Sequence, residues 1–145
     1  MTRFDFRSGR PFALDHLVHG RLWLGLGAVL IALVVVGSLT SVPAPVEGVM
    51  SNDKLVHLFV YATLMAWFAQ LFRHDLTRLL LGLGFVALGA LMEFVQGMVP
   101  ARQFDVVDMV ANTSGVLLAW ALSYTRLGEL LPAFERLLAR GLSRA

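Results

Sequence analysis

Residues 22–42 read LWLGLGAVLIALVVVGSLTSV and contain no charged side chain. A helix needs about 20 mostly apolar residues to cross the hydrocarbon core of a bilayer, so this stretch predicts a transmembrane helix. It is longer than the apolar region of roughly 7–15 residues in a cleaved signal peptide, which favours a helix that is retained. The composition of the 145-residue chain agrees, because 57% of its residues are hydrophobic and only 15% are charged. Soluble domains carry about 25% charged residues.

Three further apolar runs follow the first, at about 55–72, 79–99 and 106–124. Short connections between helices make neighbours antiparallel. The predicted fold class is therefore an all-α membrane protein with four transmembrane helices in an antiparallel up-down bundle. The expected division of the chain is an N-terminal segment, a membrane domain and a tail, at 1–21, 22–125 and 126–145.

The basic residues predict the orientation of this bundle. Ten of the twelve fall in the N-terminal segment, in the connection between the second and third helices, or in the tail: Arg3, Arg7, Arg10, Arg21, Arg73, Arg78, Arg126, Arg136, Arg140 and Arg144. The other two, Lys54 and Arg102, belong to the opposite side. Because cytoplasmic loops carry an excess of Lys and Arg, both termini are expected in the cytoplasm.

The tail has a helical pattern of its own. Apolar residues recur at helical spacing opposite a polar face of Glu135, Arg136, Ala139 and Arg140; they are Leu127, Leu130, Leu131, Phe134, Leu137, Leu138 and Leu142. Such a pattern predicts an amphipathic helix lying on the cytoplasmic surface of the membrane. Pro132 would have to sit in the first turn of that helix.

A small set of polar residues falls within the predicted spans or at their ends. We call it the polar cluster: Asp53, Lys54, His57, Tyr61, Glu93, Gln96, Arg102, Asp105, Asp108 and Asn112. Spacings of three or four residues place its members on one face of each of three helices. All three stripes begin at the end of the bundle that faces away from the cytoplasm, so we expect them to meet there. Ionisable groups at membrane depth are costly and often functional.

The charges of the polar cluster do not balance. Four carboxylates face two permanent cations, which leaves a net charge of −2 when His57 is neutral. We therefore expect a raised carboxyl pKa, a protonated His57 or a bound cation. The alternative is a structural role, in which Asp53 and Asp105 cap helix N-termini and the other residues form hydrogen bonds between helices. Small residues at Gly89 and Gly115 favour close helix packing in either case.

The ordered pattern resembles the VanZ-like family. It reads Asp53-Lys54-x-x-His57-x-x-x-Tyr61, then Glu93-x-x-Gln96, then Arg102-x-x-Asp105-x-x-Asp108-x-x-x-Asn112-x-x-Gly115. The resemblance covers roughly residues 20–125. VanZ-like proteins are small bacterial membrane proteins named for a member associated with low-level resistance to teicoplanin. The resemblance implies a role in the cell envelope and a place in the bacterial inner membrane, but no particular reaction.

Two functions follow from the polar cluster. As a binding site it would hold a lipid-linked envelope molecule or a lipoglycopeptide, with Lys54 and Arg102 pairing with phosphate or carboxylate. The hydrogen bonds that orient this ligand would come from Tyr61, Gln96 and Asn112.

As an enzyme, the chain would exchange a proton between His57 and Glu93, with Asp108 orienting His57 or stabilising its charged form. Transport ranks last, because the inner half of the spans has no polar stripe.

The cofactor is left open by the sequence. No ligand spacing of the HExxH kind supports a metal, so no metal ligand is assigned, although an oxygen-rich site can recruit a divalent ion. The absence of cysteine excludes thiolate ligands and thiol nucleophiles. Membrane lipids are the expected partners, and nucleic acid is not.

Overall fold

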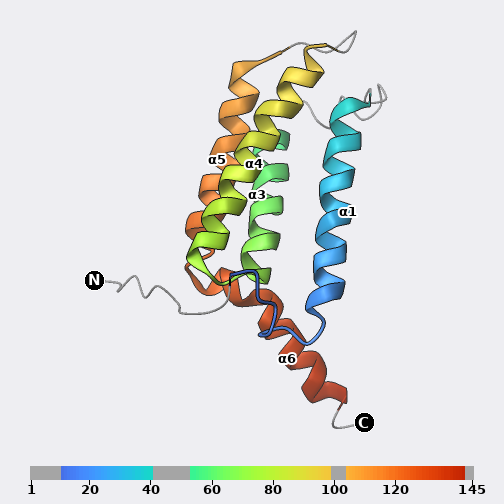
Figure 1. Cartoon of the computed structure of the whole chain (residues 1–145), viewed down its shortest axis with the longest axis vertical. Coiled ribbons are helices and arrows are strands. Elements are labelled where there is room, and N and C mark those ends of the chain that lie inside the picture. The colour runs from blue at the N-terminus through green and yellow to red at the C-terminus, as the bar shows by residue number, and fades with distance from the viewer. Residues whose placement is uncertain (1–10, 41–52, 99–103, 143–145) are drawn as a thin grey trace, which may run out of the picture.

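The computed structural model describes residues 11–40, 53–98 and 104–142. All regular elements in these ranges are helices: α1 (Gly20–Leu39), α3 (Asp53–Leu71), α4 (Asp75–Gln96), α5 (Val106–Leu122), the short 3-10 helix η1 (Arg126–Glu129) and α6 (Leu130–Leu142). Figure 1 shows α3, α4 and α5 packed as one group, with α1 alongside and α6 crossing one end. The predicted all-α class is confirmed.

Three of these helices, α1, α3 and α4, are long and apolar enough to cross a membrane. Helix α5 has 17 residues, the lower limit of the roughly 17–25 that a span needs. It continues past a bend of 79° into the C-terminal helical segment, and the bent pair together forms a fourth candidate span. Three to four membrane-length helices make this a membrane protein.

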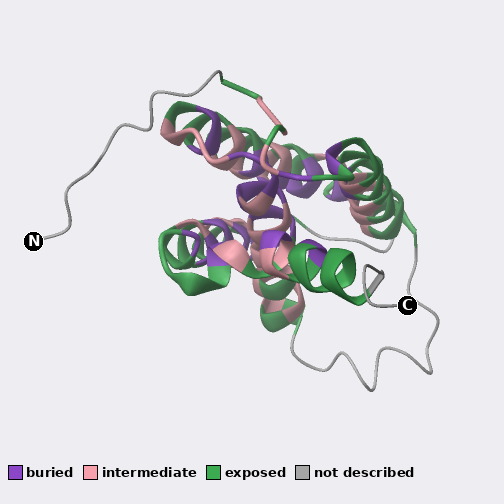
Figure 2. Cartoon of the chain, turned by 90° about the horizontal axis from the view of Figure 1, so that it is seen from below, coloured by how far each residue is buried: buried purple, intermediate pink, exposed green. Residues whose placement is uncertain are grey.

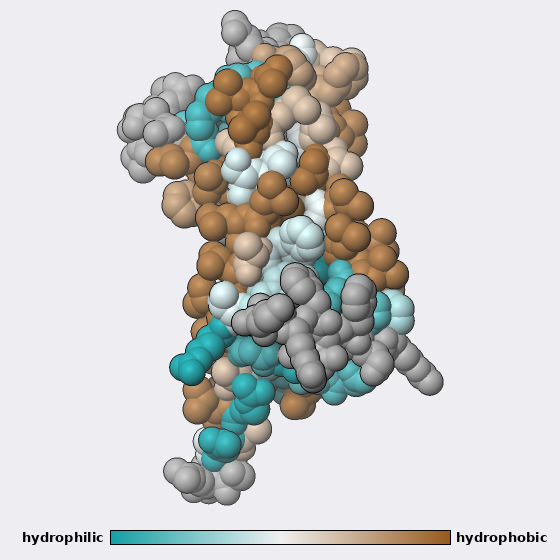
Figure 3. All heavy atoms as spheres, turned by 90° about the vertical axis from the view of Figure 1, so that its left-hand side faces the viewer, coloured by the Kyte–Doolittle hydropathy of each residue, from teal (hydrophilic) through white to brown (hydrophobic). Residues whose placement is uncertain are grey.

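The core lies between α3, α4 and α5. Its fully buried side chains include Leu64, Met65, Leu71 and Val116. Figure 2 shows the buried residues in purple on the sides of the helices that face one another. Most side chains of α1, in contrast, are exposed or half-buried, and this helix meets α3 where Trp23 lies edge to face with Trp67. Figure 3 shows apolar residues over most of one face, with hydrophilic residues gathered toward the α6 end. An apolar exterior is what a lipid environment requires.

Arg78 does not lie in a loop, as its place in the sequence suggested. The third helix begins at Asp75 rather than near residue 79, so Arg78 is inside its first turn and only 7% exposed. The guanidinium donates to the carbonyls of Phe72 and Ala69 at 2.9 Å and lies over the ring of Tyr124. The last carbonyls of a helix have no partner within the helix, and a cation there also favours the helix dipole.

Glu135 does not face solvent either, which corrects the expected polar face of the tail helix. It is 5% exposed and accepts hydrogen bonds from the backbone N–H groups of Val18 and His19 and from the indole of Trp23. These donors lie at the start of α1, which has no side-chain cap of its own. A carboxylate satisfies such N–H groups and the positive end of the helix dipole.

The apolar face of α6 therefore points away from the protein. Its exposed side chains are Leu130, Phe134, Leu137 and Leu138, preceded by Leu127 in η1. Pro132 occupies the third position of α6, in the first turn as predicted. Fixing Glu135 against α1 leaves the leucines free to enter a membrane surface.

Candidate functional site

Helices α3 and α5 approach more closely than any side chain would allow. A Cβ atom built on Gly115 of α5 would lie 2.2 Å from the carbonyl oxygen of Leu58 in α3. Only a glycine fits at this point. The close approach brings the side chains of the first two turns of α5 against those of the first two turns of α3.

Lys54 is the first link across this contact. Its ammonium forms ion pairs with Asp105 and with Asp108, the latter at 2.6 Å. Asp105 also caps α5, because its side chain accepts from the N–H of Val107 at 2.8 Å. The hydrogen bond from Lys54, together with that from Val107, lowers the pKa of Asp105. The charge of Lys54 is therefore neutralised by carboxylates of the protein itself and not by a ligand.

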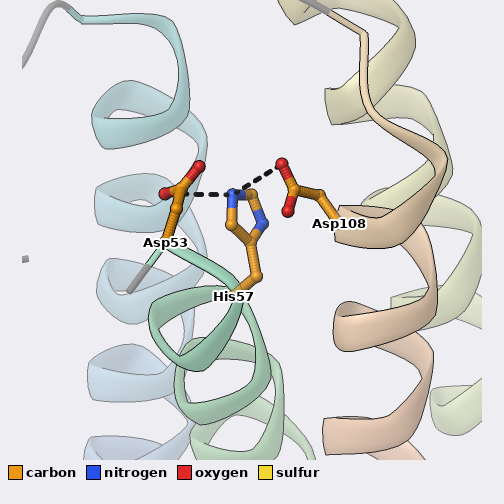
Figure 4. A group of neighbouring side chains, drawn as sticks. All are labelled: Asp53, His57 and Asp108. Atoms are coloured by element: carbon orange, nitrogen blue, oxygen red, sulfur yellow. Dashed lines mark ion pairs between the residues drawn. The ribbon is translucent and has the colours of Figure 1, made fainter. Parts of the chain in front are cut away.

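His57 lies one turn deeper, and its two ring nitrogens have different surroundings. Nδ1 is 3.0 Å from the side-chain oxygen of Asn112, an acceptor, so Nδ1 carries a proton. Nε2 faces two carboxylates, at 3.7 Å from Asp53 and 3.8 Å from Asp108. Figure 4 shows the imidazole between these carboxylates, which come from α3 and α5. Nε2 thus faces one carboxylate oxygen of Asp53 and one of Asp108, and both are too far away for a direct hydrogen bond.

Glu93 reaches the polar cluster from α4. It is 1% exposed, and one of its oxygens accepts from the backbone N–H of Asp105 at 2.6 Å. The other oxygen has no partner among the described residues, and neither has the hydroxyl of Tyr61, which is 2% exposed and within electrostatic range of Glu93. Gly89 makes room here, because a Cβ on it would be 3.1 Å from Asn112 and 3.3 Å from Tyr61.

Eight of the ten predicted site residues meet at this end of the bundle. They are Asp53, Lys54, His57, Tyr61, Glu93, Asp105, Asp108 and Asn112. Gln96 is used differently, because its amide donates to the carbonyl of Ser38 and ties α4 to α1. Arg102 lies outside the described residues. Within the described ranges, no polar side chain outside the predicted set joins this group. Nothing in the sequence indicated that the carbonyl of Ser38 would be the acceptor of Gln96.

The contacts refine two predicted roles. Asn112 makes the hydrogen bond to the His57 ring, while Asp108 faces the other ring nitrogen at 3.8 Å. Among the contacts of the described residues, Glu93 is linked to Asp105 and not to His57. The eight residues carry four carboxylates and one lysine, so the charge excess that the sequence indicated is present in the folded protein as well.

The fold and the site together define a class: a small helical membrane protein with a partly buried, acidic polar cluster at one end of its bundle. No family model matches the chain, so the resemblance to VanZ-like proteins stays a prediction. The chain is 39% identical over 83 residues to the uncharacterized protein C11E3.10 of Schizosaccharomyces pombe, an alignment that covers 55% of this chain and 51% of the yeast protein. The chain thus matches about half the length of that curated relative. No solved structure matches it.

Proposed function

We propose that this chain is a VanZ-like protein of the bacterial inner membrane whose polar cluster faces outward and binds a polar or lipid-linked envelope molecule. The proposed topology is a four-span antiparallel bundle with both termini in the cytoplasm, supported by the ten-to-two distribution of basic residues. A link to resistance against teicoplanin-type glycopeptides follows from the resemblance. These drugs act outside the cytoplasmic membrane, on the side that the polar cluster would face.

The observation that carries the binding function is the pair of unsatisfied groups at the base of the cluster. The hydroxyl of Tyr61 and one oxygen of Glu93 are both buried and unpaired within the described residues. Leaving a buried polar group without a partner costs about 1–3 kcal/mol, so a cluster that served only stability would pair them. A ligand hydroxyl suits both, because it can donate to the carboxylate and accept from the phenol, and a ligand ammonium can donate to both oxygens.

The structure changes the chemistry expected of the ligand. Since Lys54 is already paired with Asp105 and Asp108, it does not offer a free cation to a phosphate. The remaining groups favour hydroxyl or amine functions, as in a sugar, glycerol or amino-sugar headgroup. The apolar exterior around the cluster would hold the acyl or prenyl part of such a lipid.

The test uses Tyr61→Phe, which removes only the unpaired hydroxyl. Thr63→Val on the same helix is the matched control, because the Thr63 hydroxyl is exposed and bonds to Phe59 within its own helix. We expect Tyr61→Phe to leave the ligand-free protein as stable or more stable, while envelope lipid co-purified with it falls about 5–100-fold, the equivalent of one buried hydrogen bond. Mass spectrometry of bound lipid and unfolding in nanodiscs provide the two readouts.

A structural role predicts the opposite. If Tyr61→Phe destabilises the protein and co-purified lipid is unchanged, the binding function is wrong. Glu93→Gln, which keeps an acceptor for Asp105, should behave like Tyr61→Phe. In cells, both variants should stay abundant in the membrane and lose any glycopeptide phenotype.

An enzyme is the second candidate, favoured by one observation. The hydrogen bond to Asn112 occupies Nδ1 of His57, so that in the neutral ring Nε2 is free to act as a base, directed toward Asp53 and Asp108. Labelled envelope lipids incubated with the protein in liposomes distinguish the two functions, since an enzyme converts them and a binder returns them unchanged. His57→Gln should abolish conversion while Thr63→Val leaves it intact.

A further inference from the structure

We propose that Asp53, His57 and Asp108 bind a divalent transition-metal cation. One ligand atom from each of the three side chains lies within 4.8 Å of the other two. Their positions on the first turns of α3 and α5 place two carboxylate oxygens and one imidazole nitrogen around a common point (Figure 4). The sequence assigned no metal ligands, because the three residues have no motif spacing and meet only through the contact between two helices.

The separations fit a bridging cation better than a direct ion pair. A charged imidazole beside a carboxylate forms a hydrogen bond of about 2.7–2.9 Å, whereas Nε2 stands 3.7 Å from Asp53 and 3.8 Å from Asp108. Ligands of a tetrahedral zinc ion, each about 2.0–2.2 Å from the metal, lie roughly 3.4 Å from one another. The Asp53 side chain is 58% exposed in the first turn of α3, so it can close the small remaining difference by changing its rotamer.

The hydrogen bond of His57 to Asn112 suits a metal ligand. In the neutral ring, a proton on Nδ1 directed at Asn112 puts the lone pair on Nε2, the nitrogen that faces the carboxylates. Metal-binding histidines regularly donate their other N–H in this way, which fixes the tautomer and the ring orientation. Asn112 is 2% exposed, so water does not compete for the bond.

The unpaired hydroxyl of Tyr61 gives a second, separate indication of a ligand here. Tyr61 follows His57 by one turn on α3 and is 2% exposed, with no partner for its hydroxyl among the described residues. A Cβ on Gly89 would meet both the ring of Tyr61 and the side chain of Asn112, whose oxygen holds His57. The unpaired phenol therefore lies next to the residue that positions the proposed histidine ligand.

Charge also favours a cation at this point. Lys54 pairs with one oxygen of Asp108, at 2.6 Å, and leaves the other oxygen to face His57. Asp53 has no cationic partner in the described residues other than His57 itself. A divalent ion would offset the excess of carboxylates without adding a proton to the site.

The donor set selects the class of ion. An imidazole with two carboxylates suits Zn²⁺ or Mn²⁺, whereas Mg²⁺ and Ca²⁺ prefer oxygen ligands alone. Three protein ligands leave a coordination position open, as in catalytic rather than structural zinc sites. The metal site does not depend on the proposed lipid ligand, so metal alone is a sufficient probe.

The experiment measures Zn²⁺ binding to the full chain in detergent, stripped with chelator and purified with a tag that contains no histidine. We expect one equivalent of Zn²⁺ by calorimetry, displaced by Mn²⁺ and not by equal Mg²⁺. Asn112→Leu should weaken binding about 10–100-fold, the usual effect of losing the partner of a ligating histidine. His57→Gln should weaken it further, and the control His19→Gln, at the α6 end with an exposed side chain, should not change it.

A further variant keeps the test sound if His57→Gln does not fold. Asp53→Asn changes a half-exposed carboxylate in the first turn of α3 that supports no other described hydrogen bond, and it should weaken Zn²⁺ binding while helix content is unchanged. The ¹⁵N signals of His57 should show Nε2 bound to metal and Nδ1 protonated. Absence of stoichiometric binding, binding unaffected by Asp53→Asn, or a protonated Nε2 at saturating Zn²⁺ would each overturn the proposal.

Discussion

The closest contact between helices makes Gly115→Ala the sharpest test of the structure. The added Cβ would lie 2.2 Å from the carbonyl oxygen of Leu58 and 3.0 Å from the backbone nitrogen of Ala62. Favourable carbon–oxygen contacts between helices are about 3.3–3.6 Å, so α3 and α5 must separate by roughly 1 Å. Both nearby atoms belong to backbone, so no side-chain rotation can relieve the clash.

The cost follows from that displacement. Overpacking a close contact costs about 1–3 kcal/mol and occasionally more, while alanine regains up to about 1 kcal/mol of helix propensity over glycine. We expect Gly115→Ala to lower the free energy of unfolding by about 1–3 kcal/mol. The separation also pulls Asp108 away from Lys54 and His57, so Zn²⁺ affinity should fall in the same variant.

The assay is reversible unfolding in mixed micelles, followed by tryptophan fluorescence and circular dichroism. Gly84→Ala is the matched control, because a Cβ on Gly84 meets nothing within 4 Å. It should be neutral or stabilise the protein by up to about 1 kcal/mol. Equal stabilities of the two variants would refute the close contact between α3 and α5, and with it the positions of the site residues.

Four further predictions concern the α6 end and the topology. Glu135→Ala should lower the unfolding free energy by about 2–4 kcal/mol, because it removes three hydrogen bonds to a charged group. Chemical denaturation measures this loss, and a value below about 0.5 kcal/mol, typical of a surface substitution, would contradict it. Burial alone would raise the pKa of Glu135, but hydrogen bonds from Trp23, His19 and Val18 lower it. The stability that Glu135 contributes should therefore be complete above its ordinary pKa of 4.5 and disappear as the pH falls through the lowered pKa. A melting temperature that rises on acidification would contradict this. Arg78→Met should cost about 1–3 kcal/mol through the carbonyls it leaves without a donor, and equal stability in thermal unfolding would show that they find other partners. A reporter that is active only outside the cytoplasm should work when fused after Gly48 and fail after His74, and the reverse result would invert the proposed topology.

The sequence predicted the helices well and the polar cluster in part. Of the four spans predicted from runs of apolar residues, three match helices of membrane length within a few residues, because the hydrocarbon thickness sets the length of a span. Helical spacing placed Asp53 and His57 on one face, and Asp108 and Asn112 on another, and the structure confirms that these faces meet. Periodicity alone is sufficient for such statements, since it depends only on helix geometry.

The incorrect predictions concern buried polar and charged residues. Glu135 and Arg78 had positions typical of exposed residues, yet both bind backbone groups at the ends of other helices. The partners of Glu135 are at the other end of the sequence, and those of Arg78 are at the end of the preceding helix, so no periodic pattern identifies them. Gln96 was likewise placed in the polar cluster but donates to α1 instead.

The amino-acid sequence by itself determined that this chain forms apolar helices of membrane length and that one end of the bundle is polar. Both properties follow from the order of residues along a helix and from the cost of placing polar groups in lipid. Only the tertiary structure decided which polar groups pair. The approach of α3 to α5 at Gly115 directs Lys54 to Asp105 and Asp108 and places His57 between two carboxylates. Contacts between separate helices depend on packing to within an ångström, which is a property of the folded bundle and not of any one of its segments.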